Sequence, residues 1–109
     1  MNEIEFIKHI KNGIDRSNDI PDKTIQEVDS YINKNVCTEK IWNFRGDIIQ
    51  MGEGTDVYLL EDAEKSYQKA IEINPNHYEA YESLGYFHDC VMDNEKEAKK
   101  WFRLAKQKK

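Results

Sequence analysis

The sequence from Ala63 to Gly85 reads AEKSYQKAIEINPNHYEAYESLG, and the rest of the chain is organised around it. Apolar or small residues recur in its first half every three or four positions, which places them on one helical face. These residues are Ala63, Tyr67, Ala70, Ile71 and Ile73. Asn74-Pro75 ends this helix, because proline cannot continue it and pushes the preceding residue out of the helical region. A second helix is expected next, capped by Asn76 with Glu79 in the capping-box position.

A set of regularly spaced aromatic, small and apolar residues, which we call signposts, occurs twice in the chain. The first copy has Trp42, Arg45-Gly46, Ile49, Ala63, Tyr67, Ala70 and Pro75, and the second has Tyr81, Leu84-Gly85, His88, Ala98, Phe102 and Ala105. The pattern resembles the tetratricopeptide repeat, a helix pair with W-x-x-L-G-x-x-Y, then A-x-x-x-F, then P. The chain departs from the family at Arg45, where leucine is preferred, and by an insertion around Gly52-Glu53-Gly54. No proline follows Ala105.

The resemblance implies an all-α fold of three antiparallel helix pairs, stacked as a short right-handed superhelix. We expect one domain over residues 1–109, with the first repeat at 39–75 and the second at 78–109. Small residues are needed where neighbouring helices approach closely, and aromatic residues fill the wider gaps. The residues expected to be buried are Trp42, Tyr67, Ala70, Tyr81, Leu84 and Phe102.

Residues 1–36 lack the signposts and are interpreted as a divergent helix pair or a cap on the array. Isoleucines at helical spacing predict a first helix over about residues 2–16, which Gly13 is placed to end early. Ser17-Asn18-Asp19 is expected to be a connection, and Pro21 suits the first turn of a second helix. Thr38 is expected to cap the helix that follows.

Composition limits the classes of partner. Hydrophobic residues make up 39% of the chain and charged residues 34%, as expected of thin helical layers with solvated outer faces. No apolar run approaches the roughly 20 residues that cross a bilayer, so the sequence predicts a soluble, cytoplasmic protein. A net charge of -5 argues against nucleic acid or an anionic membrane as the partner.

The sequence offers no convincing catalytic, cofactor or metal site, so the expected protein is not an enzyme and needs no cofactor. His9, His77 and His88 lie in different segments, and His88, Asp89 and Cys90 are too close in sequence to share a helical face. Cys37 and Cys90 lack metal-ligand or redox spacing and are predicted to be free thiols.

The resemblance places the first helix of each pair on a concave face, and this face is the expected binding site. The predicted partner-binding residues lie beside the signposts: Lys40, Asn43, Asp47 and Gln50 in the first copy, and Glu79, Glu82, Tyr86 and Asp89 in the second. The second set keeps a spacing of three and four, so it forms one stripe along a helix. Aromatic residues anchor interfaces and carboxylates select the charge of the partner.

These observations favour a non-enzymatic protein-protein interaction module that holds a basic or polar segment of a partner protein in its groove. Some tetratricopeptide domains bind the acidic carboxyl end of heat-shock chaperones through groove lysines and asparagines. Lys40 and Asn43 fit that role, but Glu79, Glu82 and Tyr86 beside them argue against assigning it. An alternative is a structural module that self-associates through the end of the array, around Trp101 and Leu104. The oligomeric state is left open, and light scattering over a range of concentrations separates the two roles.

Overall fold

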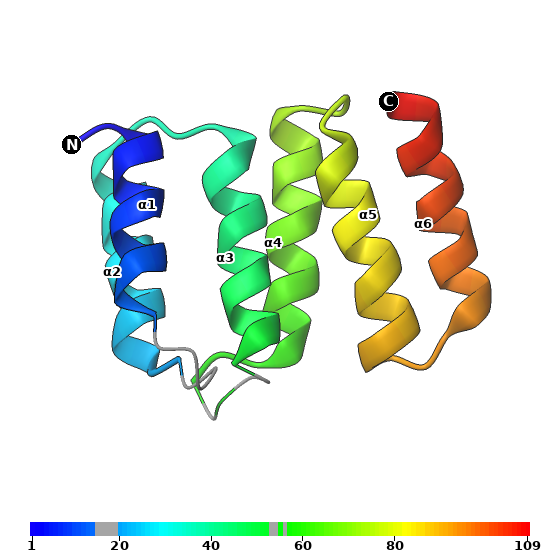
Figure 1. Cartoon of the computed structure of the whole chain (residues 1–109), viewed down its shortest axis with the longest axis horizontal. Helices are drawn as coiled ribbons and strands as arrows, with labels where there is room; N and C mark the ends of the chain where they lie inside the picture. Colours follow the sequence, from blue (N-terminus) through cyan, green and yellow to red (C-terminus); the bar gives the residue numbers. More distant parts are fainter. Residues whose placement is uncertain (15–19, 53–54, 56) are drawn as a thin grey trace.

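The computed structural model describes residues 1–14, 20–52, 55 and 57–109. Within these ranges every regular element is helical, and the helices stand side by side along the long axis of the molecule (Figure 1). Their bounds are Glu3–Gly13 for α1, Asp22–Lys34 for α2, Glu39–Met51 for α3, Leu60–Ile73 for α4, Tyr78–Tyr86 for α5 and Glu95–Lys108 for α6. A π-helical turn, η1, covers Phe87–Val91 between α5 and α6. The predicted all-α architecture of stacked helix pairs is confirmed.

Side chains at the helix ends explain where several helices begin. Thr38 caps α3 as predicted, because its hydroxyl accepts a hydrogen bond from the backbone N–H of Lys40 at 3.3 Å. Asn94 caps α6 by accepting from the backbone N–H of Glu97 at 3.2 Å. α1 ends at Gly13, the stop that the sequence indicates. Local capping chemistry therefore fixes these boundaries.

The start of α5 differs from the prediction. Asn76 does not cap this helix: the N-cap residue is His77, and no side chain makes a capping hydrogen bond there. The Asn74 side chain holds the corner instead, accepting from Asn76 N at 3.1 Å and donating to Glu39 Oε1 at 3.1 Å. Asn74 therefore uses its amide both for the local turn and for a bond to α3.

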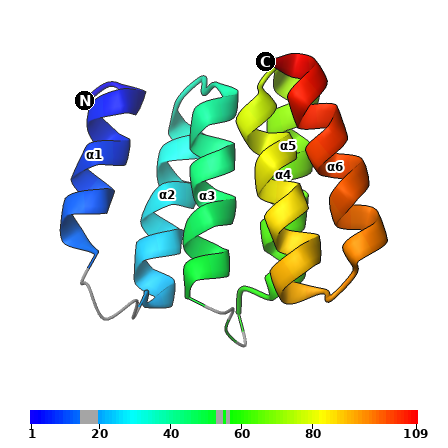
Figure 2. The same cartoon turned by 45° about the vertical axis from the view of Figure 1, so that its right-hand side comes forward.

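Two glycines let paired helices approach closely, as the sequence predicts. A β-carbon on Gly46 would lie 2.5 Å from the Tyr67 ring, and one on Gly85 would lie 2.5 Å from the Phe102 ring. Each glycine therefore gives space to an aromatic side chain of the helix paired with it, in α3–α4 and in α5–α6 (Figure 2). Tyr67 is only 1% exposed, so its ring has no room to move away.

Most of the expected core is observed, with two corrections. The buried members are Tyr67, Ala70, Tyr81 and Leu84. Trp42 and Phe102 are half-buried instead. Cζ of the Arg45 guanidinium lies 6.0 Å from the centroid of the Trp42 ring, at the edge of the helical layer. Phe102 lies on the last helix of the described chain, where no further helix covers it, and its ring makes an edge contact with Tyr86 at 5.0 Å.

The first helix pair is packed differently from the other two. Its helices are bridged by Phe6 of α1 and Tyr31 of α2, whose rings stack with centroids 4.2 Å apart. A pair bridged by two large rings stands wider apart than one in which a glycine meets a ring. The predicted connection at Ser17-Asn18-Asp19 and the insertion residues Glu53-Gly54 lie outside the described residues.

Arg45, which departs from the family pattern, is the centre of a polar network. Its Nε donates to Asp29 Oδ1 of α2 at 2.7 Å, and its Nη1 donates to Ser66 Oγ of α4 at 2.7 Å. The Tyr58 hydroxyl donates to the other oxygen of Asp29 at 3.1 Å, and the guanidinium lies 5.7 Å from the Tyr58 ring centroid. Arg45 therefore ties α3 to both of its neighbours by charge-assisted hydrogen bonds, where the family uses an apolar contact.

Both cysteines are free thiols, as predicted, but their surroundings differ. Cys90 is exposed, whereas Cys37 is partly buried and donates to the carbonyl of Asn35 at 3.5 Å. Burial, together with the nearby Glu3 carboxylate, raises the pKa of the Cys37 thiol. The thiolate is the reactive form, so Cys37 holds less of it at neutral pH than an ordinary cysteine.

We expect two thiols to react with a labelling reagent in denaturant without prior reduction. In the native protein at pH 8, Cys37→Ser should leave one fast-reacting thiol and Cys90→Ser one slow-reacting thiol, because Cys37 is less exposed and less ionised. Glu3→Gln should speed the labelling of Cys37 by removing a negative charge beside it. Equal labelling rates for the two single-cysteine variants would contradict this account of Cys37.

None of the helices in the described ranges has the length and apolar character required to span a bilayer.

Candidate binding groove

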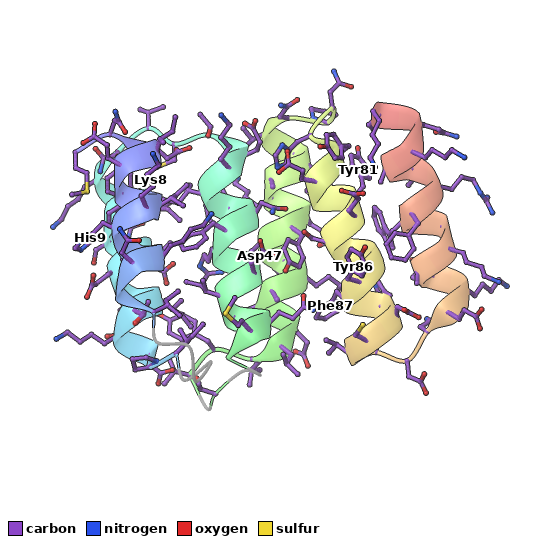
Figure 3. The ribbon with its side chains drawn as sticks, viewed as in Figure 1. Lys8, His9, Asp47, Tyr81, Tyr86 and Phe87 are labelled. Carbon is purple, nitrogen blue, oxygen red and sulfur yellow. The ribbon has the colours of Figure 1, made fainter. Side chains whose placement is uncertain are left out.

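A groove lies on the face formed by the first helix of each pair, α1, α3 and α5. It contains two adjoining pockets that share Asp47. Figure 3 shows Lys8, Asp47 and Tyr86 following one another across the stack, from α1 through α3 to α5. Each helix contributes residues at a spacing of three and four, which is why one face of each helix supplies a continuous wall.

The first pocket of the groove, which we call the mixed-charge pocket, has a volume of about 390 Å³. It is lined by Ile4, Ile7, Lys8 and Lys11 of α1, by Lys40, Asn43, Phe44 and Asp47 of α3, and by His77 and Glu79 at the start of α5. Three lysines and two carboxylates therefore face one space.

The second pocket, which we call the Asp47–Tyr86 pocket, has a volume of about 400 Å³. Its lining residues are Asp47, Gln50, Met51, Tyr67, Ser83 and Tyr86. No lysine or arginine of the described chain lines it. The pocket therefore combines one carboxylate with neutral polar groups, a thioether and two aromatic rings.

The structure brings together six of the eight predicted site residues. Those that line the two pockets are Lys40, Asn43, Asp47, Gln50, Glu79 and Tyr86. Glu82 lines neither pocket, and its Oε2 lies 3.1 Å from Nζ of Lys109 at the C-terminal end of the chain. Asp89 also lines neither pocket and lies in η1. A π-helical turn contains more residues than an α-helical turn, so the spacing of three and four no longer aligns Asp89 with Glu79.

The sequence reasoning missed the α1 wall of the groove. Lys8 and Lys11 line the mixed-charge pocket together with Ile4 and Ile7. These four residues have the spacing of one helical face, and this signal was sufficient to find them. Because the segment lacks the family's signposts, the sequence predicts only a divergent helix pair or a cap there, with no residues of the site. With these lysines the groove has a basic side as well as the predicted acidic one.

Asp47 is the polar centre of the groove. Its Oδ1 accepts a hydrogen bond from the Tyr67 hydroxyl at 2.8 Å, and the same hydroxyl lies 3.0 Å from Gln50 Oε1. Desolvation by the surrounding helices raises the pKa of the Asp47 carboxyl, and Glu79 adds to the effect, while hydrogen bonds from Tyr67 and Ser83 and the charge of Lys11 oppose it. No lysine or arginine of the described residues forms an ion pair with Asp47. This carboxylate is therefore only partly compensated.

Tyr67 remains a hydrogen-bond donor to Asp47 at all ordinary pH values. Burial and the adjacent Asp47 charge raise the pKa of its hydroxyl far above the usual range for tyrosine. A phenol that stays protonated donates one hydrogen, so it satisfies Asp47 or Gln50 at any moment, but not both. One acceptor in the Asp47–Tyr86 pocket is thus always short of a donor from this hydroxyl.

Buried polar atoms without partners occur in the wall of the mixed-charge pocket. Within the described part of the chain, Asn43 Oδ1 and His77 Nε2 make no hydrogen bond. The other ring nitrogen of His77, Nδ1, lies 3.9 Å from Glu39 Oε1. Burial acts to raise the pKa of Glu39, but the hydrogen bond from Asn74 and the nearby His77 outweigh it and lower the pKa. Glu39 is therefore ionised beside His77.

His88 has a structural partner. Its Nε2 lies 2.9 Å from Glu64 Oε2, so the side chain links η1 to α4. Among the residues that the structure describes, no group of three histidine, cysteine, aspartate or glutamate side chains is placed to hold a metal ion. Trp101 and Leu104, the predicted self-association surface, are both half-buried.

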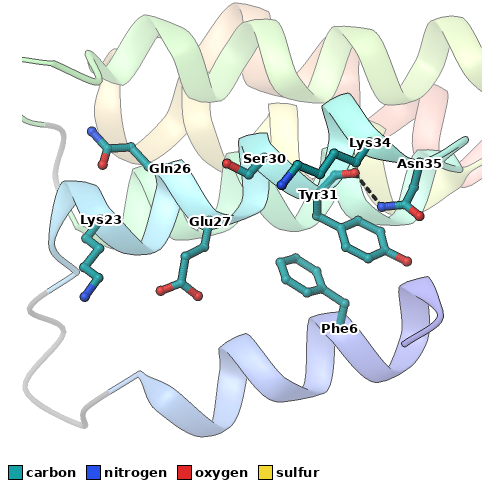
Figure 4. Close-up of a pocket in the computed structure, with 8 residues that line it drawn as sticks. All are labelled: Phe6, Lys23, Gln26, Glu27, Ser30, Tyr31, Lys34 and Asn35. Carbon is teal, nitrogen blue, oxygen red and sulfur yellow. Dashed lines mark hydrogen bonds between the residues drawn. The ribbon is translucent and has the colours of Figure 1, made fainter.

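A third pocket, which we call the end pocket, lies outside the groove between α1 and α2 (Figure 4). It has a volume of about 420 Å³ and is lined by Phe6, Lys23, Gln26, Glu27, Ser30, Tyr31, Lys34 and Asn35. The Asn35 amide donates to the Tyr31 carbonyl at 2.9 Å, so part of its polar lining is already paired. None of the predicted site residues lies in the end pocket.

Comparison with known proteins gives one match. Residues 66–100 match a family model described as tetratricopeptide repeat, over a stretch from Ser66 in α4 through α5 to Lys100 in α6. No curated protein and no solved structure matches the chain.

Proposed function

Because this chain carries a tetratricopeptide repeat, we propose that it is a non-enzymatic interaction module that holds a basic or polar segment of a partner protein in the groove of α1, α3 and α5. The single observation that carries the proposal is the pair of adjoining pockets on that face, which share Asp47. Repeat proteins use the concave surface of the stack to bind extended partners.

The lining chemistry supports a peptide segment over a small apolar ligand. The mixed-charge pocket presents lysines on α1 and carboxylates on α3 and α5, so a polar chain of either charge finds partners along the groove. Asn43 and His77 each hold a buried polar atom without a hydrogen bond, and such atoms cost free energy until they are paired. Rim charges of this kind raise association rates and set specificity more than they raise affinity.

The test begins with peptides selected from a random display library against the immobilised protein. Binding of the selected peptides is then measured for Asn43→Arg, which fills the mixed-charge pocket, and for Gln68→Arg, on the exposed surface of α4. Both changes introduce the same side chain in the middle of a helix. We expect Asn43→Arg to weaken binding at least about tenfold, a change of about 1.4 kcal/mol, and Gln68→Arg to have little effect.

Urea unfolding of both variants controls for damage to the fold. If a folded Asn43→Arg variant binds every selected peptide as tightly as the parent, or if Gln68→Arg is the variant that loses binding, the groove is not the binding surface.

A further inference from the structure

We propose that the Asp47–Tyr86 pocket receives a positively charged side chain, lysine or arginine, of the bound segment. The inference rests on the proposed function, because it assigns the chemistry of one position in the segment that the groove holds.

The acceptors of the pocket are incompletely paired. Asp47 and Gln50 compete for the one hydrogen of the Tyr67 hydroxyl, at 2.8 and 3.0 Å. A long hydrogen bond of 3.5 Å runs from Asn43 Nδ2 to Asp47 Oδ2, and the Ser83 side chain is a further hydrogen-bond partner of the carboxylate, but none of these neutral groups supplies a positive charge. A desolvated carboxylate without a cation is costly, and an ammonium or guanidinium group supplies both the missing charge and the missing donors.

The walls suit the rest of a long basic side chain. Met51 and Tyr86 are exposed by 44% and 57%, so both side chains are accessible to a bound segment. A methionine side chain adapts to an aliphatic stem, and the face of a tyrosine ring attracts a cation. The Tyr86 ring is held by its edge contact with Phe102 at 5.0 Å, so this wall is already in place.

The neighbouring charges distinguish this pocket from the other half of the groove. Lys8, Lys11 and Lys40 line the mixed-charge pocket, whereas no lysine or arginine of the described chain lines the Asp47–Tyr86 pocket. A cation is therefore repelled less on the Tyr86 side of Asp47 than on the α1 side. Charge complementarity selects a basic residue here and leaves the mixed-charge pocket for neutral or acidic groups.

The experiment uses three blocked pentapeptides with the central residue arginine, lysine or citrulline, flanked by glycines, titrated into the ¹⁵N-labelled full chain. Citrulline keeps the shape of arginine and removes its charge. We expect saturable chemical-shift changes at Asp47, Gln50 and Tyr86 with the arginine and lysine peptides. The citrulline peptide should bind with an affinity at least about fivefold lower. The lysine and arginine arms show which cation the pocket prefers.

Three variants make the assignment specific. Asp47→Asn keeps an acceptor for the Tyr67 hydroxyl and removes the charge, and Tyr86→Leu alters an exposed wall without touching the core. Each of these two changes should lower the affinity for the arginine and lysine peptides at least about fivefold. Glu72→Gln, which removes an exposed carboxylate on α4 outside both groove pockets, should leave binding of these peptides nearly unaffected. Fold integrity is checked by the unfolding midpoint of each variant.

The outcomes separate this inference from the proposed function. Equal binding of the citrulline peptide, no binding of any basic peptide, or unchanged binding by both Asp47→Asn and Tyr86→Leu overturns the cation pocket. If one of these results is found while library-selected peptides still bind the parent protein and are lost in Asn43→Arg, the groove function stands and only the cation pocket is wrong.

Discussion

Replacing Gly46 with alanine is expected to lower the free energy of unfolding by about 2 kcal/mol, one of the two largest single-residue effects that we foresee. The new β-carbon would lie 2.5 Å from the Tyr67 ring, which is 1% exposed and has no room to shift. Alanine favours a helix over glycine by about 0.5 to 1 kcal/mol, which offsets only part of the clash. Urea unfolding monitored by circular dichroism gives the change in midpoint.

Two further glycines provide matched controls. Gly85→Ala meets the Phe102 ring at the same 2.5 Å, but Phe102 is half-buried and can turn outward, so a smaller loss is expected. Gly13→Ala meets nothing within 4 Å and should change stability by less than about 0.5 kcal/mol. If the Gly46→Ala variant is as stable as the Gly13→Ala variant, α3 and α4 do not pack closely against each other at Gly46.

The second large effect is expected from the polar network around Arg45. Asp29→Ala removes the carboxylate from a guanidinium that is 15% exposed and takes away the acceptor of the Tyr58 hydroxyl. Leaving a partly buried charge without its partner should cost about 2 to 3 kcal/mol. The loss is read from urea unfolding, as for the glycine variants.

A double-mutant cycle isolates the Asp29–Arg45 interaction. Arg45→Leu introduces the residue that the family pattern has at this position, and Asp29→Ala with Arg45→Leu should lose less stability than the two single changes together, by at least about 1 kcal/mol. Lys99→Ala serves as the control, because its pair with Glu95 is 70% and 77% exposed and should contribute less than about 0.5 kcal/mol. Additive losses in the cycle would mean that the two side chains act independently.

Much of the fold could be predicted because its determinants are local. Helical spacing and the proline after Asn74 act within one helix or one turn, so a single sequence shows them. Gly46 and Gly85 contact the paired helix, but the repeated pattern of small residues marks both positions. The predicted cap at Asn76 was wrong because α5 begins one residue later, with His77 as its N-cap. The bond from Asn74 to Glu39, a residue far away in sequence, was not visible in the pattern either. The same limit hid the Arg45 network, which joins three helices.

The candidate site was predicted in part, for similar reasons. The α3 residues and Glu79 were found because the signposts fix which face of their helices is open. Lys8 and Lys11 were missed because α1 has no signposts, although its isoleucines have the right spacing. The pairing of Glu82 with Lys109 depends on where the last helix ends, and the sequence pattern does not fix that position.

Amide chemical-shift mapping with a library-selected peptide tests whether the face of α1, α3 and α5 binds the partner segment. We expect saturable changes to cluster on the two groove pockets, at Lys8, Asn43, Asp47 and Tyr86, and the outer surfaces of α2 and α4 to stay unchanged. Changes that cluster instead at the end pocket around Phe6 and Tyr31, or on α4 around Gln68, would contradict it.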